Sequence, residues 1–134
     1  MWDKLFYSST LLQKGLDASW KRSSVIANNI ANNDTPGFKS SKVEFETTLA
    51  RALETDAFAA RKTREGHMDI GTASLDNIRP IVITPQDSSM RMDENNVDIE
   101  QEMADMAKNS IYYYTLTSKI SKDLGLLKIA ITSK

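Results

Sequence analysis

The clearest pattern in the chain is a hydrophobic repeat that fills its last third. Between residues 99 and 131, apolar or small hydroxyl side chains recur at alternating intervals of four and three. These positions are Ile99, Met103, Met106, Ser110, Tyr113, Thr117, Ile120, Leu124, Leu127 and Ile131. Such a heptad seam is typical of a helix that packs along another helix in a left-handed supercoil. Asp98, with Gln101 three positions later, resembles a capping box and predicts the start of this helix.

A thinner heptad pattern near the N-terminus predicts a partner helix. Two lines of residues repeat every seven positions: Leu5, Leu12, Ser19 and Ile26 form the first, and Ser9, Leu16, Ser23 and Ile30 form the second. This helix is expected to end within residues 32–37, because a proline at position 36 disfavours helical backbone at Thr35. The Pro36-Gly37 pair suits the two central positions of a type II turn.

The segment between the two heptad regions is less regular. Ser41 and Glu44 form a second capping-box pattern, and it predicts a short helix that carries Phe45, Leu49 and Leu53 at intervals of four. Residues 55–76 are polar and poorly patterned, which predicts a loop.

The residues before the C-terminal helix suggest a small β-hairpin. Residues 78–84 are mostly apolar and are interrupted or followed by prolines, as expected of an edge strand. Residues 86–89 could turn this strand into a second one near residues 90–92. The chain is therefore expected to have three parts, namely the N-terminal helix and turn (1–39), a small variable middle segment (40–96) and the C-terminal helix (97–134).

The predicted helix lengths exclude a compact globule. A helix from Ile99 to Ile131 would be about 50 Å long at ~1.5 Å per residue. A compact domain of 134 residues would have a diameter of only roughly 36 Å. We therefore expect a mainly α-helical, elongated fold, in which two long terminal helices form an antiparallel coiled-coil pair.

One partner helix would not cover all of the apolar surface of the C-terminal helix. Seven further residues with apolar or aromatic side chains lie off the heptad seam: Ala104, Ala107, Ile111, Tyr114, Leu116, Leu126 and Ile129. Exposed patches of this kind usually mark a protein–protein contact. We expect self-assembly or obligate partner binding. The alternative is that the middle segment folds back over these residues.

Composition narrows the function further. The chain has 17 basic and 18 acidic side chains, which does not favour binding to nucleic acid or to anionic membranes. It has no cysteine and one histidine, so thiolate chemistry and multi-histidine metal sites are excluded. The five glycines form no phosphate-binding loop. No apolar run reaches the ~20 residues of a membrane span, and the N-terminus has no classical signal-peptide pattern.

The residues that could carry chemistry are better explained by structure. His67 lies in a polar stretch, where a lone histidine is usually solvated. Residues 93–98 superficially suggest a calcium loop, but Val97 and Asp98 stand where a ligand and a glycine are required. The run Tyr112-Tyr113-Tyr114 is expected to serve packing, since neighbouring helical side chains splay about 100° apart. No enzyme activity, catalytic residue, cofactor, metal or small-molecule substrate is therefore expected.

An asparagine tract closes the N-terminal helix. Residues 27–34 repeat with period four and stack Asn28 on Asn32 and Asn29 on Asn33. Asparagine is a poor helix former, so this run needs a reason. One interpretation is capping at the helix end. The other is side-chain amides that bridge to neighbouring chains, with small alanines allowing close approach.

The same tract carries a family resemblance. Residues 27–39, with the sequence ANNIANNDTPGFK, resemble the N-terminal signature of the axial proteins of the bacterial flagellum, which comprise rod, hook and hook-associated proteins. The C-terminal part looks like the FlgB family of proximal rod proteins at residues 95–100, Glu102, Met103, residues 106–110, Tyr113, Thr117, Leu127 and Lys128, and the short length agrees. The similarly short FlgC family is the nearest alternative, although it lacks this form of the signature.

The resemblance implies a structural role without catalysis. Such subunits form the base of the rod that crosses the periplasm, and they are exported through the flagellar type III apparatus without a cleaved signal. Implied partners are other copies of the chain, other rod proteins, the rod–ring adaptor FliE and export-gate components. Competing hypotheses are a soluble helical-hairpin adaptor or export chaperone, and a hydrolase that uses His67.

The heptad seams, the asparagine tract and the turn together form the expected assembly interface. It comprises Leu12, Leu16, Ile26, Ala27, Asn28, Asn29, Ile30, Ala31, Asn32, Thr35, Pro36, Gly37, Phe38, Ile99, Met103, Met106, Ser110, Tyr113, Thr117, Ile120, Leu124, Leu127 and Ile131.

Overall fold

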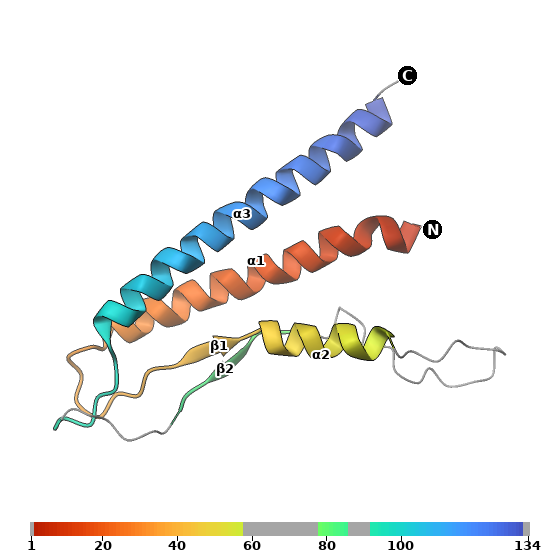
Figure 1. The fold of residues 1–134 in the computed structure, drawn as a ribbon. Helices are drawn as coiled ribbons and strands as arrows, with labels where there is room; N and C mark the ends of the chain where they lie inside the picture. The colour runs from red at the N-terminus through yellow and green to blue at the C-terminus, as the bar shows by residue number, and fades with distance from the viewer. Residues whose placement is uncertain (1, 58–77, 86–91, 133–134) are drawn as a thin grey trace.

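A computed structural model describes residues 2–57, 78–85 and 92–132 of the 134-residue chain. Its elements are α1 (Trp2–Ala31), β1 (Lys42–Glu44), α2 (Glu46–Ala57), β2 (Ile81–Ile83) and α3 (Ile99–Thr132). The two long helices run antiparallel, and the molecule is elongated (Figure 1). The prediction of a mainly helical fold with a long terminal helix pair is confirmed.

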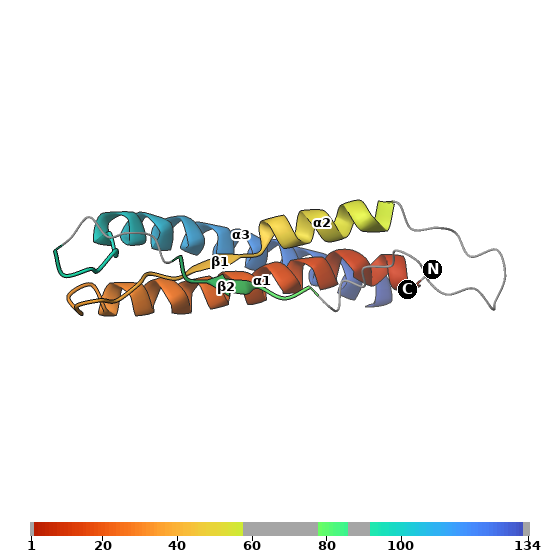
Figure 2. The same ribbon diagram turned by 90° about the horizontal axis from the view of Figure 1, so that it is seen from below.

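The elements form three layers. In Figure 1, α1 lies between α3 on one side and the layer of β1, β2 and α2 on the other, and Figure 2 shows this third layer from below. Both termini lie at the same end of the molecule. The helices α1 and α3 diverge toward these termini (Figure 1), so the specific contacts between them concentrate in the half of the molecule near the turn.

The turn after α1 follows the prediction from sequence. Asn32 Nδ2 donates a hydrogen bond of 2.8 Å to the Asn28 carbonyl, which caps the helix end. The Phe38 amide then donates to the Thr35 carbonyl at 3.3 Å, and Gly37 between them has a φ of 72°. An i to i+3 hydrogen bond with a left-handed third residue is the geometry of a type II turn.

The main apolar core lies between α1 and the middle segment. Phe45, which is 1% exposed, packs with the buried side chains of Ala18 and Ile78. Three partly buried residues complete this cluster: Leu11, Leu49 and Ala52. The alternative that the middle segment covers the surplus apolar residues of α3 is therefore wrong for the described residues, since their apolar contacts are made with α1.

The second capping box was a wrong prediction. Residues 42–44 form β1, and α2 begins at Glu46 and extends to Ala57, past the point where a loop was expected. The Ser41 amide donates to Asn29 Oδ1 at 3.0 Å, and the Ser41 hydroxyl lies 2.8 Å from that of Thr84. Ser41 is thus held by α1 and by the segment after β2, and it does not cap α2.

The strand at residues 81–83 was predicted, but its partner was not. It pairs antiparallel with β1, with Val43 opposite Val82, and Val43 points inward as the buried residue of its strand. Met92 lies in a turn and is fully exposed, so this residue is not part of a strand. The remaining predictions for residues 58–77, including His67, and for residues 86–91 lie outside the described residues.

Candidate assembly surface

The face that α3 turns toward α1 differs from the predicted seam. Its residues are spaced by seven and are buried or half-buried: Glu102, Asn109, Leu116 and Asp123. Each stands one position before a seam residue, and one residue corresponds to about 100° of rotation on a helix. The prediction that the apolar seam of α3 faces α1 along its full length is therefore wrong.

The seam divides into two lines in the structure. Met106, Ile120 and Leu127 are half-buried at the edge of the contact with α1, and Tyr113 is 40% exposed. The other line is exposed and consists of Met103, Ser110, Thr117, Leu124 and Ile131, and Ile99 at the start of the first line is exposed as well. Within the exposed line, Met103 is 58% exposed and Leu124 is 55% exposed. More than half of the strongest hydrophobic repeat of the chain is therefore exposed to solvent.

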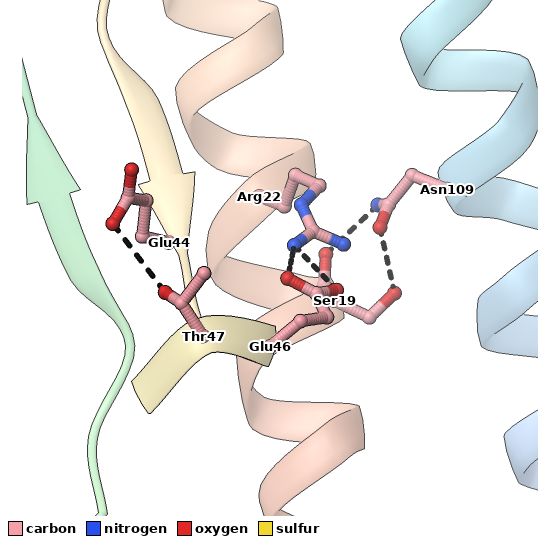
Figure 3. A network of polar contacts seen from close by, with 6 residues as sticks. All are labelled: Ser19, Arg22, Glu44, Glu46, Thr47 and Asn109. Atoms are coloured by element: carbon pink, nitrogen blue, oxygen red, sulfur yellow. Dashed lines mark hydrogen bonds and ion pairs between the residues drawn. The ribbon is translucent and has the colours of Figure 1, made fainter. Parts of the chain in front are cut away.

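Polar layers join α1 to α3. In the first, the Ser19 hydroxyl donates to Asn109 Oδ1 at 3.0 Å, while Asn109 Nδ2 donates to the Ser19 carbonyl at 2.9 Å and to Ser23 Oγ at 2.8 Å. Figure 3 shows Asn109 pointing from α3 toward Ser19 on α1. Asn109 is 2% exposed, and a buried amide is stable only when its donors and acceptor are satisfied, as they are here.

The second polar layer contains a buried carboxylate. Asn29 Nδ2 donates to Glu102 Oε1 at 3.0 Å and to the Ser41 carbonyl at 2.8 Å. Burial raises the pKa of Glu102, and the negative charges of Asp105 and Asp98 raise it further, against the hydrogen bond from Asn29 and the positive charge of Lys42. A single asparagine thus connects α1, the entry to β1 and α3.

These contacts decide how the members of the asparagine tract behave within the chain. Asn32 supports the capping interpretation, since it bonds the end of its own helix. Asn29 is buried and bridges elements of the same chain, which neither interpretation had foreseen. Asn28 is exposed, so a contact with a neighbouring chain stays a prediction for that residue.

A third buried asparagine joins the turn to the segment that precedes α3. Asn95 Nδ2 lies 2.9 Å from the carbonyl oxygens of Asn32, Asn33 and Thr35, and Asn95 Oδ1 accepts from the Val97 amide at 2.7 Å. Sequence reasoning did not foresee this contact, because the spacing of Asn95 from the turn carries no periodic signal. The asparagine pair at 95 and 96, which lies just before the helix cap Asp98, was the available hint.

Helix entry at α3 was predicted correctly. Asp98 Oδ1 accepts hydrogen bonds from the amides of Glu100 at 3.0 Å and Gln101 at 3.2 Å. A carboxylate at this position satisfies amides that have no partner within the helix and interacts favourably with the helix dipole.

The expected interface residues of α1 and the turn are distributed over several faces. Ile26 and Asn29 are buried within the chain, and Leu12, Leu16, Ile30, Asn32 and Phe38 are half-buried. Ala27, Asn28, Ala31, Thr35, Pro36 and Gly37 are exposed. The side chain of Leu5 lies outside the described part of the chain. The exposed members form one end of the molecule, beside the turn.

The outer side of α3 is also apolar. Ile111, Tyr114, Leu126 and Ile129 are each more than half exposed. Near Tyr114, a shallow hollow of about 240 Å³ is lined by Trp20, Ser23, Ser110, Tyr113 and Tyr114, and the rings of the two tyrosines meet edge to face with centroids 6.3 Å apart. A helix that is apolar on several sides is normally buried on several sides.

A second groove, of about 460 Å³, lies where α1, β1 and α3 meet. Its charged side chains are largely paired. Arg22 binds both carboxylate oxygens of Glu46 at 2.8 and 2.7 Å (Figure 3), and Lys108 lies 3.3 Å from Asp105. Burial works to raise the pKa of Glu46, but the hydrogen bonds and charge of Arg22, together with hydrogen bonds from backbone amides, outweigh it and leave the pKa lowered. The arrangement is suited to joining helices at a neutral surface.

Within the described residues, no group of three histidine, aspartate or glutamate side chains is placed to hold a metal ion. No helix in the described ranges has the length and hydropathy needed to span a bilayer.

Long antiparallel helices with polar internal layers and uncovered apolar sides define an elongated structural subunit that packs against other helices. A family model described as flagella basal body rod protein matches residues 12–39. The flagellar basal body rod protein FlgB of Bacillus subtilis is 32% identical over 128 residues, which cover 94% of this chain and 95% of the relative. The FlgB proteins of Borrelia hermsii and Aeromonas hydrophila are 36% and 35% identical, covering 83% and 87% of this chain and 85% and 86% of the relatives. The chain belongs to the FlgB family of flagellar basal body rod proteins.

Membership in this family gives the chain a structural role in the flagellar basal body, where it assembles with other rod components. It does not favour the alternative of a soluble hairpin adaptor or export chaperone. The predictions of family, fold and general function made from sequence are therefore confirmed.

Proposed function

We propose that this chain forms the proximal part of the rod, where copies of it and of other rod proteins pack side by side into a hollow shaft that transmits torque. The observation that carries the proposal is the uncovered apolar surface of α3. Leu124 and Ile131 on the seam, and Ile111 and Leu126 off it, are each more than half exposed. Neighbouring subunits would bury these side chains and stabilise the assembly in proportion to the apolar area removed from water.

The proposal assigns different roles to the three parts of the chain. Residues 1–39 and 97–134 form the packed wall of the shaft, and residues 40–96 lie on its outside. The exposed members of the interface expected from sequence would make the contacts between subunits, with the exposed seam line of α3 as the main apolar contribution. Torque then passes through many packed contacts and requires no catalytic step, cofactor or metal.

The proposal also concerns location and neighbours. We place the subunit in the periplasmic part of the basal body, delivered by the flagellar type III apparatus without a cleaved signal. FliE and components of the export gate would be its neighbours at the membrane end of the rod. The near-neutral charge of the chain, −1 at pH 7, supports dense packing, since subunits with a large net charge would repel one another.

A charge placed on the exposed seam tests this function. Leu124→Asp should leave the isolated chain folded, because Leu124 is 55% exposed, but it should abolish incorporation into basal bodies and motility. A carboxylate buried without a partner costs several kcal/mol at each interface. Ala50→Asp, at an exposed position of α2, is the matched control and should assemble normally. Normal swimming of the Leu124→Asp strain would refute the proposed interface.

A further inference from the structure

The buried polar layers raise the question of what they contribute to a protein that assembles through apolar surfaces. On α3, apolar side chains lie on several sides, including Leu116 toward α1, Met103 and Leu124 on the exposed seam, and Ile111 and Ile129 on the outer side. Burial of apolar area is not directional. It therefore gives α3 little reason to present one particular face to α1.

The two polar layers do distinguish the faces. Asn109 makes three hydrogen bonds to Ser19 and Ser23, and Glu102 accepts from Asn29. Their exposed sequence neighbours Met103 and Ser110 could not replace them, because a rotation of about 100° would separate Asn109 and Glu102 from their partners on α1. Each amide or carboxylate would then be desolvated without a partner, or the helix pair would have to open.

The layers also fix the position of α3 along α1. Asn29 meets Glu102 near the turn, and Ser19 meets Asn109 one heptad further along α3. Beyond them, a methyl group placed on Gly15 would lie 3.2 Å from Leu116 Cδ1, so the helices approach closely at that point. A polar residue at an otherwise apolar helix contact is a known way to specify register and orientation at some expense of stability.

We propose that Asn109 and Glu102 are the specificity-determining residues for assembly, because they hold the polar face of α3 against α1 and so keep the apolar seam available to neighbouring subunits. This inference rests on the proposed function, since it concerns the same apolar seam. In the absence of the layers, the seam would compete for α1 within the same chain. The free subunit would then hide the surface that it needs for assembly.

Two single-cysteine reporters measure the rotation of α3. The chain contains no cysteine, so Leu116→Cys and Thr117→Cys each introduce one thiol, the first half-buried toward α1 and the second exposed. In the parent sequence the thiol at position 117 should react with a maleimide at least about fivefold faster than that at 116, because thiol reactivity follows exposure. With Asn109→Leu or Glu102→Leu, the ratio should fall toward one.

Two control variants test whether the labelling ratio depends on the polar layers themselves or changes with any substitution on α3. Glu102→Gln keeps an oxygen that accepts from Asn29 and should keep the parent labelling ratio. Ser118→Leu, at an exposed position of α3, adds the same leucine without touching a layer and should also keep it. The Asn109→Leu and Glu102→Leu chains should remain helical by circular dichroism, yet fail to restore motility to a strain that lacks the parent chain.

Each outcome decides the matter. If the labelling ratio stays unchanged in both leucine variants, the inference is overturned. It is also overturned if the ratio falls to about one and the variants still assemble into the rod. Loss of helical structure in both variants would also overturn it, since the layers would then be required for folding and not for the choice of face. If the parent chain itself failed to enter basal bodies, the proposed function would fall, while the labelling ratio would still report on the rotation of α3.

Discussion

Asn29 on α1 and Glu102 on α3 lie 73 positions apart in the sequence and meet through a hydrogen bond of 3.0 Å that is buried in the structure. The same asparagine holds the backbone of Ser41 on both its amide and its carbonyl side. A change at this point is therefore felt by both long helices and by the start of the middle segment.

The ionisation of Glu102 should make stability depend on pH. Its pKa in the folded chain is raised above 4.5, the ordinary value of a glutamate, by burial and by the nearby charges of Asp105 and Asp98. Ionisation is thus less favourable in the folded state, so the stability contribution of this group is full below about pH 4.5 and declines as the pH rises through the folded pKa. Glu102→Gln removes this decline and should raise the Tm by a few degrees at pH 7.

The gain from Glu102→Gln should shrink as the pH is lowered toward 4.5 and below, which thermal unfolding at several pH values can follow. Glu100→Gln, at an exposed position of the same helical turn, is the control. Its Tm should depend on pH in the same way as that of the parent chain. A lower Tm for Glu102→Gln at pH 7 would contradict the prediction.

Removal of the Asn95 side chain should loosen the turn. Asn95→Ala removes the hydrogen bonds that this side chain makes with three carbonyls of the turn and with the Val97 amide. The expected loss in the free energy of unfolding is about 1–3 kcal/mol, the range for a buried polar contact. Urea denaturation measures it. Asn28→Ala, at an exposed position of α1, should be neutral or slightly stabilising, and an equal loss in both variants would argue against a special role for Asn95.

Two glycines should respond in opposite directions to the same substitution. Neither Gly37 nor Gly125 has any atom within 4 Å of the position where a methyl group would be added. Gly37 has a φ of 72°, so Gly37→Ala should cost about 1–2 kcal/mol through backbone strain. Gly125 lies within α3, so Gly125→Ala should stabilise by about 1 kcal/mol through helix propensity. Chemical denaturation of both variants checks the two signs.

The contact of α1 with the middle segment should dominate the stability of the free chain. Phe45→Ala empties the centre of the cluster with Ala18 and Ile78 and should cost about 3–5 kcal/mol. Tyr114→Ala, which removes an aromatic ring that is 71% exposed, should change the stability by no more than about 0.5 kcal/mol. Equilibrium unfolding that ranked the two variants in the reverse order would place the core elsewhere.

The features that the sequence predicted well depend on neighbours in the chain. Asp98 caps α3 by bonding amides two and three positions away, and Pro36 with Gly37 forms a turn closed by residues three apart. Helix length likewise follows from an uninterrupted pattern. Local geometry determines such features, so a single sequence contains them.

The features that the sequence missed depend on contacts between distant segments. The heptad seam correctly placed a helix at residues 99–132, but it did not predict which face of this helix would meet α1. That face is selected by hydrogen bonds of Glu102 with Asn29 and of Asn109 with Ser19, whose partners lie on the other helix. The strand Ile81–Ile83 was visible as a strand, while its pairing with Lys42–Glu44 depended on how Ser41 is held by α1.

The sequence by itself determined two long helices, the turn between Thr35 and Phe38 and the family to which the chain belongs. Only the tertiary structure decided that two polar layers lie in the contact between the helices and that more than half of the apolar seam stays outside. The physical reason is that α3 carries apolar side chains on several sides, so hydrophobic burial alone does not select a face. Directional hydrogen bonds from Asn29, Ser19 and Ser23 make that selection, and they exist only once the helices are side by side.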